Sequence, residues 1–238
     1  MGDALKGQVA IITGAAHGMG EAIAKAYARE GAALGLMDVQ GEPLAKVVQD
    51  VRALGALVMG QVADVRQYPE IEKGVKAFES AFGPTDILVC AAGLGIYKPF
   101  EAISEDDWDT TFDVNVKGTF LSCKAVIPGM VQRQKGLVIT IASIAAVMRG
   151  FNTGAVYGPS KYAVRGFSRY MDVELRSKGV TVCCLNPGST DSHFRGKPTG
   201  NPDMMVPEDV AKAALYVATQ RDRVAVWEIF FSMINEGW

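Results

Sequence analysis

The strongest fold signal in this chain is a glycine-rich run, Thr13-Gly14-Ala15-Ala16-His17-Gly18-Met19-Gly20. It follows the apolar run Gln8–Thr13 and opens an alanine-rich segment with helical periodicity. A helix N-terminus binds pyrophosphate because it combines free backbone N–H groups with a favourable dipole. We expect Gly14 to allow a tight turn, Gly18 a close approach of backbone to phosphate, and Gly20 close packing of helix on strand. The spacing alone would also suit a simple connecting turn, but its place between a strand and a helix favours a dinucleotide site.

An acidic residue closes the second apolar run, Ala33–Asp38. A carboxylate there accepts hydrogen bonds from both hydroxyls of an adenosine ribose and repels a 2′-phosphate, so Asp38 predicts NAD rather than NADP. The alternative is a helix N-cap or a solvated aspartate. His17 is a basic residue that would help to bind a phosphate, but a neutral imidazole is a weak anchor at physiological pH. Asp38 therefore decides the cofactor prediction.

Short apolar runs and longer amphipathic segments alternate along the chain. The predicted strands are rich in Val, Ile and Leu and cover Gln8–Thr13, Ala33–Asp38, Ala56–Val62, Asp86–Cys90, Leu137–Ser143, Val180–Leu185 and Ala225–Phe231. The predicted helices lie between them, at Gly18–Glu30, Glu42–Leu54, Pro69–Phe82, Glu105–Arg133, Gly154–Lys178 and Pro207–Gln220. Several runs are apolar throughout, which is typical of strands buried on both faces. The pattern predicts an α/β protein with a doubly wound Rossmann fold, whose seven-stranded, mostly parallel sheet carries helices on both faces.

No linker, repeat or low-complexity tract divides the 238 residues. We therefore expect a single dinucleotide-binding domain over residues 1–238. The least regular stretch is Gly188–Val206, between a predicted strand and a predicted helix. Loops at the carboxyl ends of strands line the ligand crevice in such folds, so residues 189–206 are predicted to form a short substrate lid.

The composition excludes several classes of protein. Lys and Arg number 24 against 26 Asp and Glu, so the basic excess of a nucleic-acid-binding module is absent. The four cysteines show no C-x-x-C pair, which with two histidines predicts buried reduced thiols and no metal site. No signal peptide and no run of about 18 apolar residues is present. We expect a cytoplasmic protein with neither membrane nor nucleic acid as partner.

One tyrosine is placed for acid–base chemistry. Of the seven tyrosines only Tyr157 has a lysine, Lys161, four positions later, and residues so spaced share a helix face. An ammonium beside a phenol lowers the phenol pKa from its usual value of about 10, so the tyrosine can exchange a proton with an alcohol near neutral pH. Ser143 closes a predicted strand, where its hydroxyl can hold the substrate oxygen. A Tyr–Lys pair alone more often decorates a surface, but together with Ser143 and the glycine run it favours catalysis.

These motifs resemble those of the short-chain dehydrogenase/reductase family in its typical single-domain form, over essentially the whole chain. Besides the glycine run, the resemblance rests on Asp64, Ala91-Ala92-Gly93, Asn115, Ser143, Tyr157-x-x-x-Lys161 and Pro187-Gly188. It implies that Tyr157 is the general acid/base and that Lys161 lowers its pKa and binds the nicotinamide ribose. It further implies that Ser143 orients the carbonyl and that Asn115, in a long helix, holds a water that relays protons to Lys161.

The resemblance also implies the cofactor contacts. Asp64 would bind the adenine amino group beside the backbone of Val65, and the Pro187-Gly188 turn would pack on the nicotinamide. Thr190 and Ser192 would contact its carboxamide. The predicted cofactor-binding residues are Thr13, Gly14, His17, Gly18, Met19, Gly20, Asp38, Val39, Ala63, Asp64, Val65, Ala91, Ala92, Gly93, Tyr157, Lys161, Pro187, Gly188, Thr190 and Ser192.

Two features depart from the family pattern. Cys90 stands where the family has Asn before Ala91-Ala92-Gly93, and we interpret it as a small buried thiol. The chain stops soon after the last predicted strand, where relatives often continue into a tail used at a tetramer interface. We still expect a homodimer or homotetramer, because the segments matching Glu105–Arg133 and Gly154–Lys178 commonly pair between subunits in this family.

The substrate pocket is predicted to be mostly apolar, which suits a hydrophobic alcohol or ketone as the small-molecule partner. Its candidate residues, each of which would equally suit the core, are Leu94, Ile96, Ala145, Phe151 and Phe194. The sequence thus predicts an NAD(H)-dependent oxidoreductase that interconverts a secondary alcohol and a ketone or aldehyde. The alternatives are an NADP-dependent reductase of 3-oxoacyl thioesters and a non-catalytic dinucleotide-binding scaffold.

Overall fold

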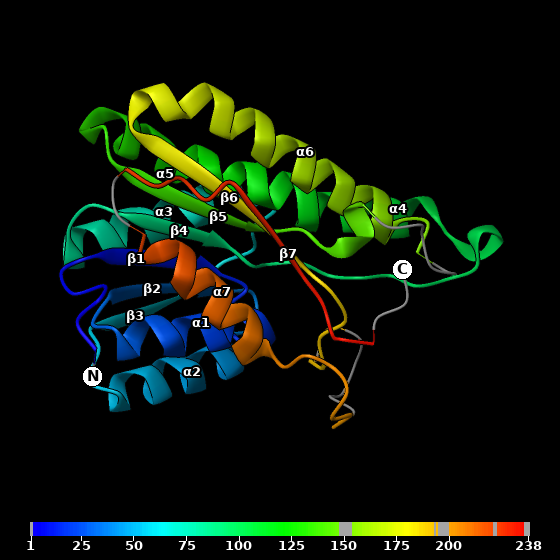
Figure 1. The fold of residues 1–238 in the computed structure, drawn as a ribbon, viewed down its shortest axis with the longest axis horizontal. Coiled ribbons are helices and arrows are strands. Elements are labelled where there is room, and N and C mark those ends of the chain that lie inside the picture. The colour runs from blue at the N-terminus through cyan, green and yellow to red at the C-terminus, as the bar shows by residue number, and fades with distance from the viewer. Residues whose placement is uncertain (1, 148–153, 193, 195–199, 221–222, 236–238) are drawn as a thin grey trace.

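A seven-stranded sheet forms the centre of the protein in a computed structural model that describes residues 2–147, 154–192, 194, 200–220 and 223–235 (Figure 1). Its strands are β1 Val9–Thr13, β2 Ala33–Asp38, β3 Val58–Val62, β4 Ile87–Cys90, β5 Gly136–Ile141, β6 Val180–Pro187 and β7 Glu228–Phe231. They lie in the order β3-β2-β1-β4-β5-β6-β7, and each pair of neighbours is parallel. The doubly wound α/β prediction is confirmed, and the sheet is wholly rather than mostly parallel.

Helices cover both faces of the sheet (Figure 1). One face carries α1 Gly18–Arg29, α2 Gly41–Ala53 and α7 Pro207–Ala218. The other carries α3 Tyr68–Phe82, α5 Gly118–Arg133 and α6 Tyr157–Leu175, with the short α4 Glu105–Phe112 beside them. Within the described residues, no helix is both long and apolar enough to cross a bilayer.

Each layer of helices shares its own apolar core with the sheet. In β1, Ile11 packs into the core under α3 and α5, whereas Ile12 packs into the core under α1 and α7. Successive side chains of a strand point to opposite faces, so a strand covered on both sides buries every residue. This is why all five residues of β1 are buried, and why its sequence shows no alternation of apolar and polar residues.

The strand order reverses between β1 and β4, and such a reversal opens a crevice outside the carboxyl ends of the strands. Thr13 and Cys90, the last residues of these two strands, are paired in register. Beyond them, the Thr13 hydroxyl oxygen accepts a hydrogen bond of 3.4 Å from the backbone N–H of Ala92. The loops that follow β1 and β4 therefore meet at the crevice.

Ser143 was expected to close a strand, but β5 ends two residues earlier, at Ile141. The chain leaves the ladder because the Ser143 Oγ accepts a hydrogen bond from the backbone N–H of Ala145. That contact starts a single 3₁₀ turn over Ile144–Ala146. Side chains that bond to nearby backbone in this way compete with the sheet ladder.

Three other strand boundaries differ by two residues or more from those predicted. β3 begins at Val58 rather than Ala56, and β7 begins at Glu228 rather than Ala225. β6 continues to Pro187, because that residue still pairs with Phe231 of the last strand. Pairing with a neighbouring strand, rather than the extent of the apolar run, sets these ends.

The predicted helix Glu105–Arg133 is interrupted. α4 begins after Ser104, whose side chain and that of Asp107 form a reciprocal capping box. A wider π-helical turn, Asp113–Lys117, then separates α4 from α5. Such turns insert an extra residue and recur at functional sites, and this one contains Asn115.

The predicted helix Gly154–Lys178 begins later than expected, at Tyr157. Pro159 explains the difference, because proline lacks an N–H and is tolerated only within the first turn of a helix. At the other end, α6 stops at Leu175 and a 3₁₀ turn, Arg176–Lys178, leads into β6. Tyr157 therefore stands at the first position of α6.

Candidate active site

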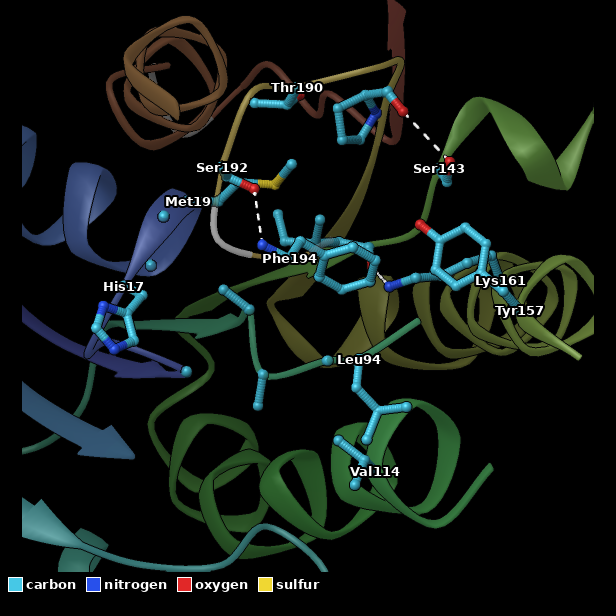
Figure 2. A pocket seen from close by; sticks show the side chains of 18 of the residues that line it. His17, Met19, Leu94, Val114, Ser143, Tyr157, Lys161, Thr190, Ser192 and Phe194 are labelled. Atoms are coloured by element: carbon cyan, nitrogen blue, oxygen red, sulfur yellow. Dashed lines mark hydrogen bonds between the residues drawn. The ribbon is translucent and has the colours of Figure 1, made fainter. Parts of the chain in front are cut away.

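A cavity of about 1210 Å³ opens at the carboxyl ends of the strands (Figure 2). Its walls come from the loops that follow β1 to β6, together with α4, α6 and the segment after β7. Ligand pockets for drug-sized molecules span roughly 300–1,000 Å³, so this cavity has room for a larger ligand or for two adjacent ones.

Most of the predicted cofactor-binding residues line this cavity. The exception is Thr13, which is buried behind the wall and accepts the hydrogen bond from Ala92. The others form its walls: Gly14, His17, Gly18, Met19, Gly20, Asp38, Val39, Ala63, Asp64, Val65, Ala91, Ala92, Gly93, Tyr157, Lys161, Pro187, Gly188, Thr190 and Ser192.

The glycine run forms a tight turn that leads into α1. Gly14 has a φ of +67°, and a Cβ there would lie 2.5 Å from the backbone nitrogen of Ala92. A Cβ at Gly20 would lie 2.1 Å from the carbonyl oxygen of Gly14, so this turn and helix pack too closely for any side chain. His17, the N-cap of α1, makes no capping hydrogen bond with its side chain. The first residues of α1 line the cavity, so the N-terminus of this helix is placed to bind an anion there.

Asp38 lies between the glycine run and the start of α2. One carboxylate oxygen accepts a hydrogen bond of 3.0 Å from the N–H of Ala16, and the other accepts one of 2.9 Å from the N–H of Gln40. Each oxygen keeps a further lone pair, because a carboxylate has about four acceptor sites. Asp38 thus stabilises the local turn and still presents negative charge to the cavity.

Asp64 follows β3 and is bound by a residue that the sequence did not single out. The guanidinium of Arg66 contacts both of its carboxylate oxygens, with N–O distances of 2.6 to 3.0 Å. The hydrogen bond from Arg66 holds the pKa of the Asp64 carboxyl below its usual range. Arg66 also lines the cavity. It stands two residues after Asp64, and no sequence motif predicted that the two would pair.

Tyr157 and Lys161 lie together in the wall, as their spacing predicted. Both side chains are buried, and the Lys161 amine lies 5.6 Å from the centre of the tyrosine ring. Lys161 donates a hydrogen bond of 2.9 Å to the carbonyl oxygen of Ile141. Burial lowers the pKa of Lys161 to about 8, so the amine is still mostly protonated at neutral pH.

Ser143 connects two loops of the site. Its hydroxyl donates a hydrogen bond of 3.4 Å to the carbonyl oxygen of Pro187 while accepting the one from Ala145. Figure 2 shows the Tyr157 hydroxyl turned toward Ser143. The tyrosine, the lysine and the serine therefore face one end of the cavity, where a substrate oxygen can meet both hydroxyls.

Asn115 is buried and does not line the cavity. Its side-chain amide accepts a hydrogen bond of 2.8 Å from the N–H of Leu94 and donates one of 2.9 Å to the Leu94 carbonyl oxygen. It also donates to the hydroxyl of Ser160 on α6 at 3.0 Å. Asn115 thus fixes the loop after β4 to the helix that carries Tyr157, and its predicted role in holding a water stays a prediction.

The substrate end is apolar and aromatic. Of the predicted substrate residues, Leu94 and Phe194 line the cavity, whereas Phe151 lies outside the described residues. Ile96 and Ala145 do not line it, and Ala145 is instead buried in the turn after Ser143.

Two rings flank the ring of Tyr157. The ring centre of Tyr97 lies 5.4 Å from that of Tyr157, and the ring centre of Phe194 lies 5.6 Å from it on an edge-to-face contact. Figure 2 shows Phe194 projecting into the cavity. The lining residues that motif reasoning did not identify include Thr110, Val114, Ile144 and Met233.

Comparison with known proteins agrees with this geometry. A model of the short chain dehydrogenase family matches residues 8–201. The chain is 36% identical over 227 residues, 90% of each chain, to (2S)-[(R)-hydroxy(phenyl)methyl]succinyl-CoA dehydrogenase subunit BbsD of Thauera aromatica. It is 34% identical over 243 residues to glycine betaine reductase ATRR of Emericella nidulans, but it spans only 19% of that protein.

Solved structures match along almost the whole chain. An alcohol dehydrogenase from the archaeon Thermococcus sibiricus, complexed with 5-hydroxy-NADP, superposes with a TM-score of 0.90 at 30% identity, covering 97% of this chain and 98% of that one. A short chain dehydrogenase from Mycobacterium paratuberculosis, bound to NAD, superposes with a TM-score of 0.88 at 27% identity, covering 95% and 97%.

Proposed function

The chain belongs to the short-chain dehydrogenase/reductase family and is an oxidoreductase of that family, and on this premise we propose that it interconverts a secondary alcohol and a ketone or aldehyde with NAD(H). The observation that carries the proposal is the buried Tyr157–Lys161 pair beside Ser143, in the wall of a cavity that also contains the glycine turn. A scaffold that merely binds a dinucleotide has no need of such a pair.

The residues at one end of the cavity fit a dinucleotide. The turn at Gly14 and the uncapped start of α1 suit a pyrophosphate, and Asp38 suits the hydroxyls of an adenosine ribose. The negative charge of Asp38 disfavours a 2′-phosphate, which supports NAD over NADP. When bound, NAD supplies the hydride acceptor that the oxidation of an alcohol requires.

The chain's own residues handle the proton. Tyr157 accepts the hydroxyl proton when an alcohol is oxidised and returns a proton when a ketone is reduced. Lys161 is cationic at neutral pH and stabilises the phenolate form. The Ser143 hydroxyl holds the substrate oxygen in line with Tyr157, which limits the poses that the substrate can take.

A neutral, apolar substrate is favoured by the walls near Tyr157. Among the described lining residues at this end, Lys161 is the charged one, and the rest include Leu94, Tyr97 and Phe194. The name of the Thauera relative contains a hydroxy(phenyl)methyl group. Because Tyr97 and Phe194 offer aromatic faces, we propose an aryl-substituted secondary alcohol or the matching ketone as the substrate class.

Residues 189–206, of which 193 and 195–199 lie outside the described residues, are proposed to act as the lid of a single domain. The ends of the segment are joined by a bridge between Thr190 and Met205, in which the Asp191 N–H donates to the Met205 carbonyl oxygen at 2.8 Å. Phe194 and Met204 of this segment line the cavity. A segment anchored at both ends beside the site can close over a substrate without unfolding.

Self-association is proposed through the outward faces of α5 and α6. Phe120 on α5 and Tyr162 and Tyr170 on α6 are exposed, and 82% of Tyr170 is accessible. Exposed rings gathered on helices of one face mark an interaction surface. Light scattering should give the mass of a dimer or tetramer, and a monomer at micromolar concentration would contradict this part of the proposal.

The test of the proposed reaction is a panel of secondary alcohols and ketones, assayed with NAD(H) and NADP(H). We expect turnover of 1-phenylethanol and acetophenone with NAD(H), and slower turnover with NADP(H). Faster reduction of a 3-oxoacyl thioester with NADPH would favour the alternative activity. Tight NAD binding without turnover of any member would favour a scaffold.

A further inference from the structure

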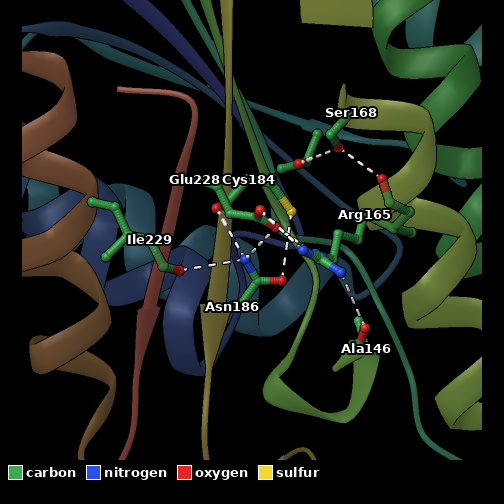
Figure 3. Close-up of polar contacts among 9 residues, drawn as sticks. Ala146, Arg165, Ser168, Cys184, Asn186, Glu228 and Ile229 are labelled. Carbon is green, nitrogen blue, oxygen red and sulfur yellow. Dashed lines mark hydrogen bonds and ion pairs between the residues drawn. The ribbon is translucent and has the colours of Figure 1, made fainter. Parts of the chain in front are cut away.

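An ion pair behind the catalytic serine links α6 to the edge of the sheet (Figure 3). Arg165 of α6 contacts Glu228 of β7 twice, with Nε–Oε1 at 2.5 Å and Nη2–Oε2 at 3.2 Å. The two side chains are 22% and 15% exposed. The guanidinium also lies 5.2 Å from the ring centre of Phe230, which covers it on one side.

From Glu228 the contacts continue to β6. The Asn186 side-chain amide donates to Glu228 Oε1 at 3.1 Å and to the Ile229 carbonyl oxygen at 3.4 Å (Figure 3). Asn186 is fully buried and directly precedes Pro187, which lines the cavity. The carbonyl oxygen of Pro187 accepts the hydrogen bond from the Ser143 hydroxyl. Glu228 therefore helps, through Asn186, to hold the carbonyl group that binds this hydroxyl.

From Arg165 the contacts continue to the turn that begins at Ser143. The Nη1 of Arg165 donates to the carbonyl oxygen of Ala146 at 3.5 Å. The N–H of Ala146 donates to the Ser143 carbonyl oxygen at 2.9 Å. Arg165 stands one helical turn after Lys161 on α6, so the helix that carries the tyrosine and lysine also holds the serine turn.

These contacts close a ring: Ser143, Pro187, Asn186, Glu228, Arg165 and Ala146. We propose that Arg165 and Glu228 are positioning residues of the reaction, which hold the Ser143 hydroxyl in place relative to Tyr157 and Lys161. This inference rests on the proposed function of the cavity. An ion pair taken from water gains little net stability, because desolvation offsets the attraction, so fold stability alone is a weak reason for the pair.

Arg165→Met tests the proposal, and Arg176→Met is its matched control. Arg176 begins the 3₁₀ turn that directly follows α6, at the end remote from the cavity, and is paired with the buried Asp172 of α6. With 1-phenylethanol and NAD, we expect Arg165→Met to lower kcat by roughly 10- to 100-fold, since a displacement of about 1 Å can cost that much. The KM for NAD should change by less than about twofold, and Arg176→Met should keep kcat within about twofold of wild type.

The pH profile separates positioning from a general loss of structure. Arg165 does not contact the Tyr157 hydroxyl or the Lys161 amine in any hydrogen bond of the described residues, so the midpoint of the profile should stay at its wild-type value while the plateau falls. Glu228→Gln keeps the shape of the side chain and should lower the plateau in the same way. An unchanged kcat in Arg165→Met, or an equal loss in Arg176→Met, overturns the proposal.

Hydrogen exchange provides a readout that needs no substrate. The amides of residues 145–147 should exchange faster in Arg165→Met than in either the wild type or Arg176→Met, because the Ala146 carbonyl has lost its donor. Equal exchange in the three proteins overturns the positioning role. If the wild type turns over no member of the panel, the proposed reaction fails, and the exchange result alone then decides whether Arg165 holds the turn.

Discussion

The two ends of the cavity use charge in opposite ways. At the end near β2 and β3, Asp38, Asp64 and Arg66 are in contact with solvent and make short local hydrogen bonds. At the other end, Lys161 is buried beside the ring of Tyr157, which in turn contacts the ring of Phe194. A charged side chain in contact with water incurs little desolvation free energy. A buried charged side chain incurs a large one, which shifts its pKa toward the neutral form.

The pKa shifts at the two ends have the same direction but opposite meaning. The hydrogen bond from Arg66 lowers the pKa of Asp64, which favours the charged carboxylate. Burial lowers the pKa of Lys161 to about 8, which favours the neutral amine. The ion pair therefore favours the charge of Asp64, whereas burial disfavours the charge of Lys161, and such perturbed groups cluster at functional sites.

Removing the Tyr157 hydroxyl, at the buried end of the cavity, should have the largest effect on turnover. Tyr157→Phe keeps the ring between Tyr97 and Phe194 but removes the proton acceptor, so turnover should fall by about 10²- to 10⁴-fold. Fluorescence titration should give an NAD affinity within about twofold of wild type. Normal turnover by the purified variant would contradict the assignment of the acid/base.

The buried amine should lower the stability of the fold. A pKa depressed from 10.5 to about 8 corresponds to as much as about 3 kcal/mol, which Lys161→Met should recover at pH 7 in urea unfolding of the cofactor-free protein. Between pH 8 and 10.5 the unfolded wild type binds more protons than the folded one, so its stability rises with pH and the gain of the variant disappears. A variant less stable than wild type at pH 7 would show that contacts of the Lys161 ammonium in the folded protein outweigh the cost of burying its charge.

Activity should depend on pH through the same pair. Alcohol oxidation requires Tyr157 in its phenolate form, so its rate should rise with pH, while ketone reduction, which requires the protonated phenol, should fall. In Lys161→Met the residual oxidation should shift its midpoint upward toward the usual tyrosine pKa of about 10. An unshifted midpoint would mean that the lysine does not tune the tyrosine.

At the solvent end, Asp38→Asn should change cofactor choice more than rate. The amide keeps an acceptor for Ala16 or Gln40 but removes the negative charge that repels a 2′-phosphate. We expect kcat/KM with NADP, relative to NAD, to rise by about tenfold, equivalent to about 1.4 kcal/mol. An unchanged ratio would remove Asp38 from cofactor selection.

The smallest effect is expected at Arg66. Arg66→Ala breaks a solvent-exposed ion pair with Asp64, and such pairs contribute about 0.2–1 kcal/mol. Urea unfolding should therefore show a loss below about 1 kcal/mol, far smaller than the change at Lys161. A larger loss of unfolding free energy would contradict the view that charges at the solvent-exposed end of the cavity affect stability less than the buried charge of Lys161.

Local patterns were enough to predict most secondary structure and the pairing of Tyr157 with Lys161. Strand and helix positions follow from apolar periodicity, and Tyr157 and Lys161 meet because four residues make about one helical turn. Two predicted boundaries were wrong because a nearby residue intervened: Pro159 at the start of α6 and Ser143 at the end of β5. Both errors were small because the elements themselves were identified correctly.

The linear chain specified the glycine turn, the acidic end of β2 and the lysine one turn after the tyrosine, since each depends on residues a few positions apart. Folding alone brought Arg165 to Glu228, which is 63 residues away, and Asn115 to Leu94, which is 21 away. The dry environment that shifts the pKa of Lys161 is likewise made by residues from several strands and loops. Such contacts depend on how whole elements pack, and no local spacing encodes them.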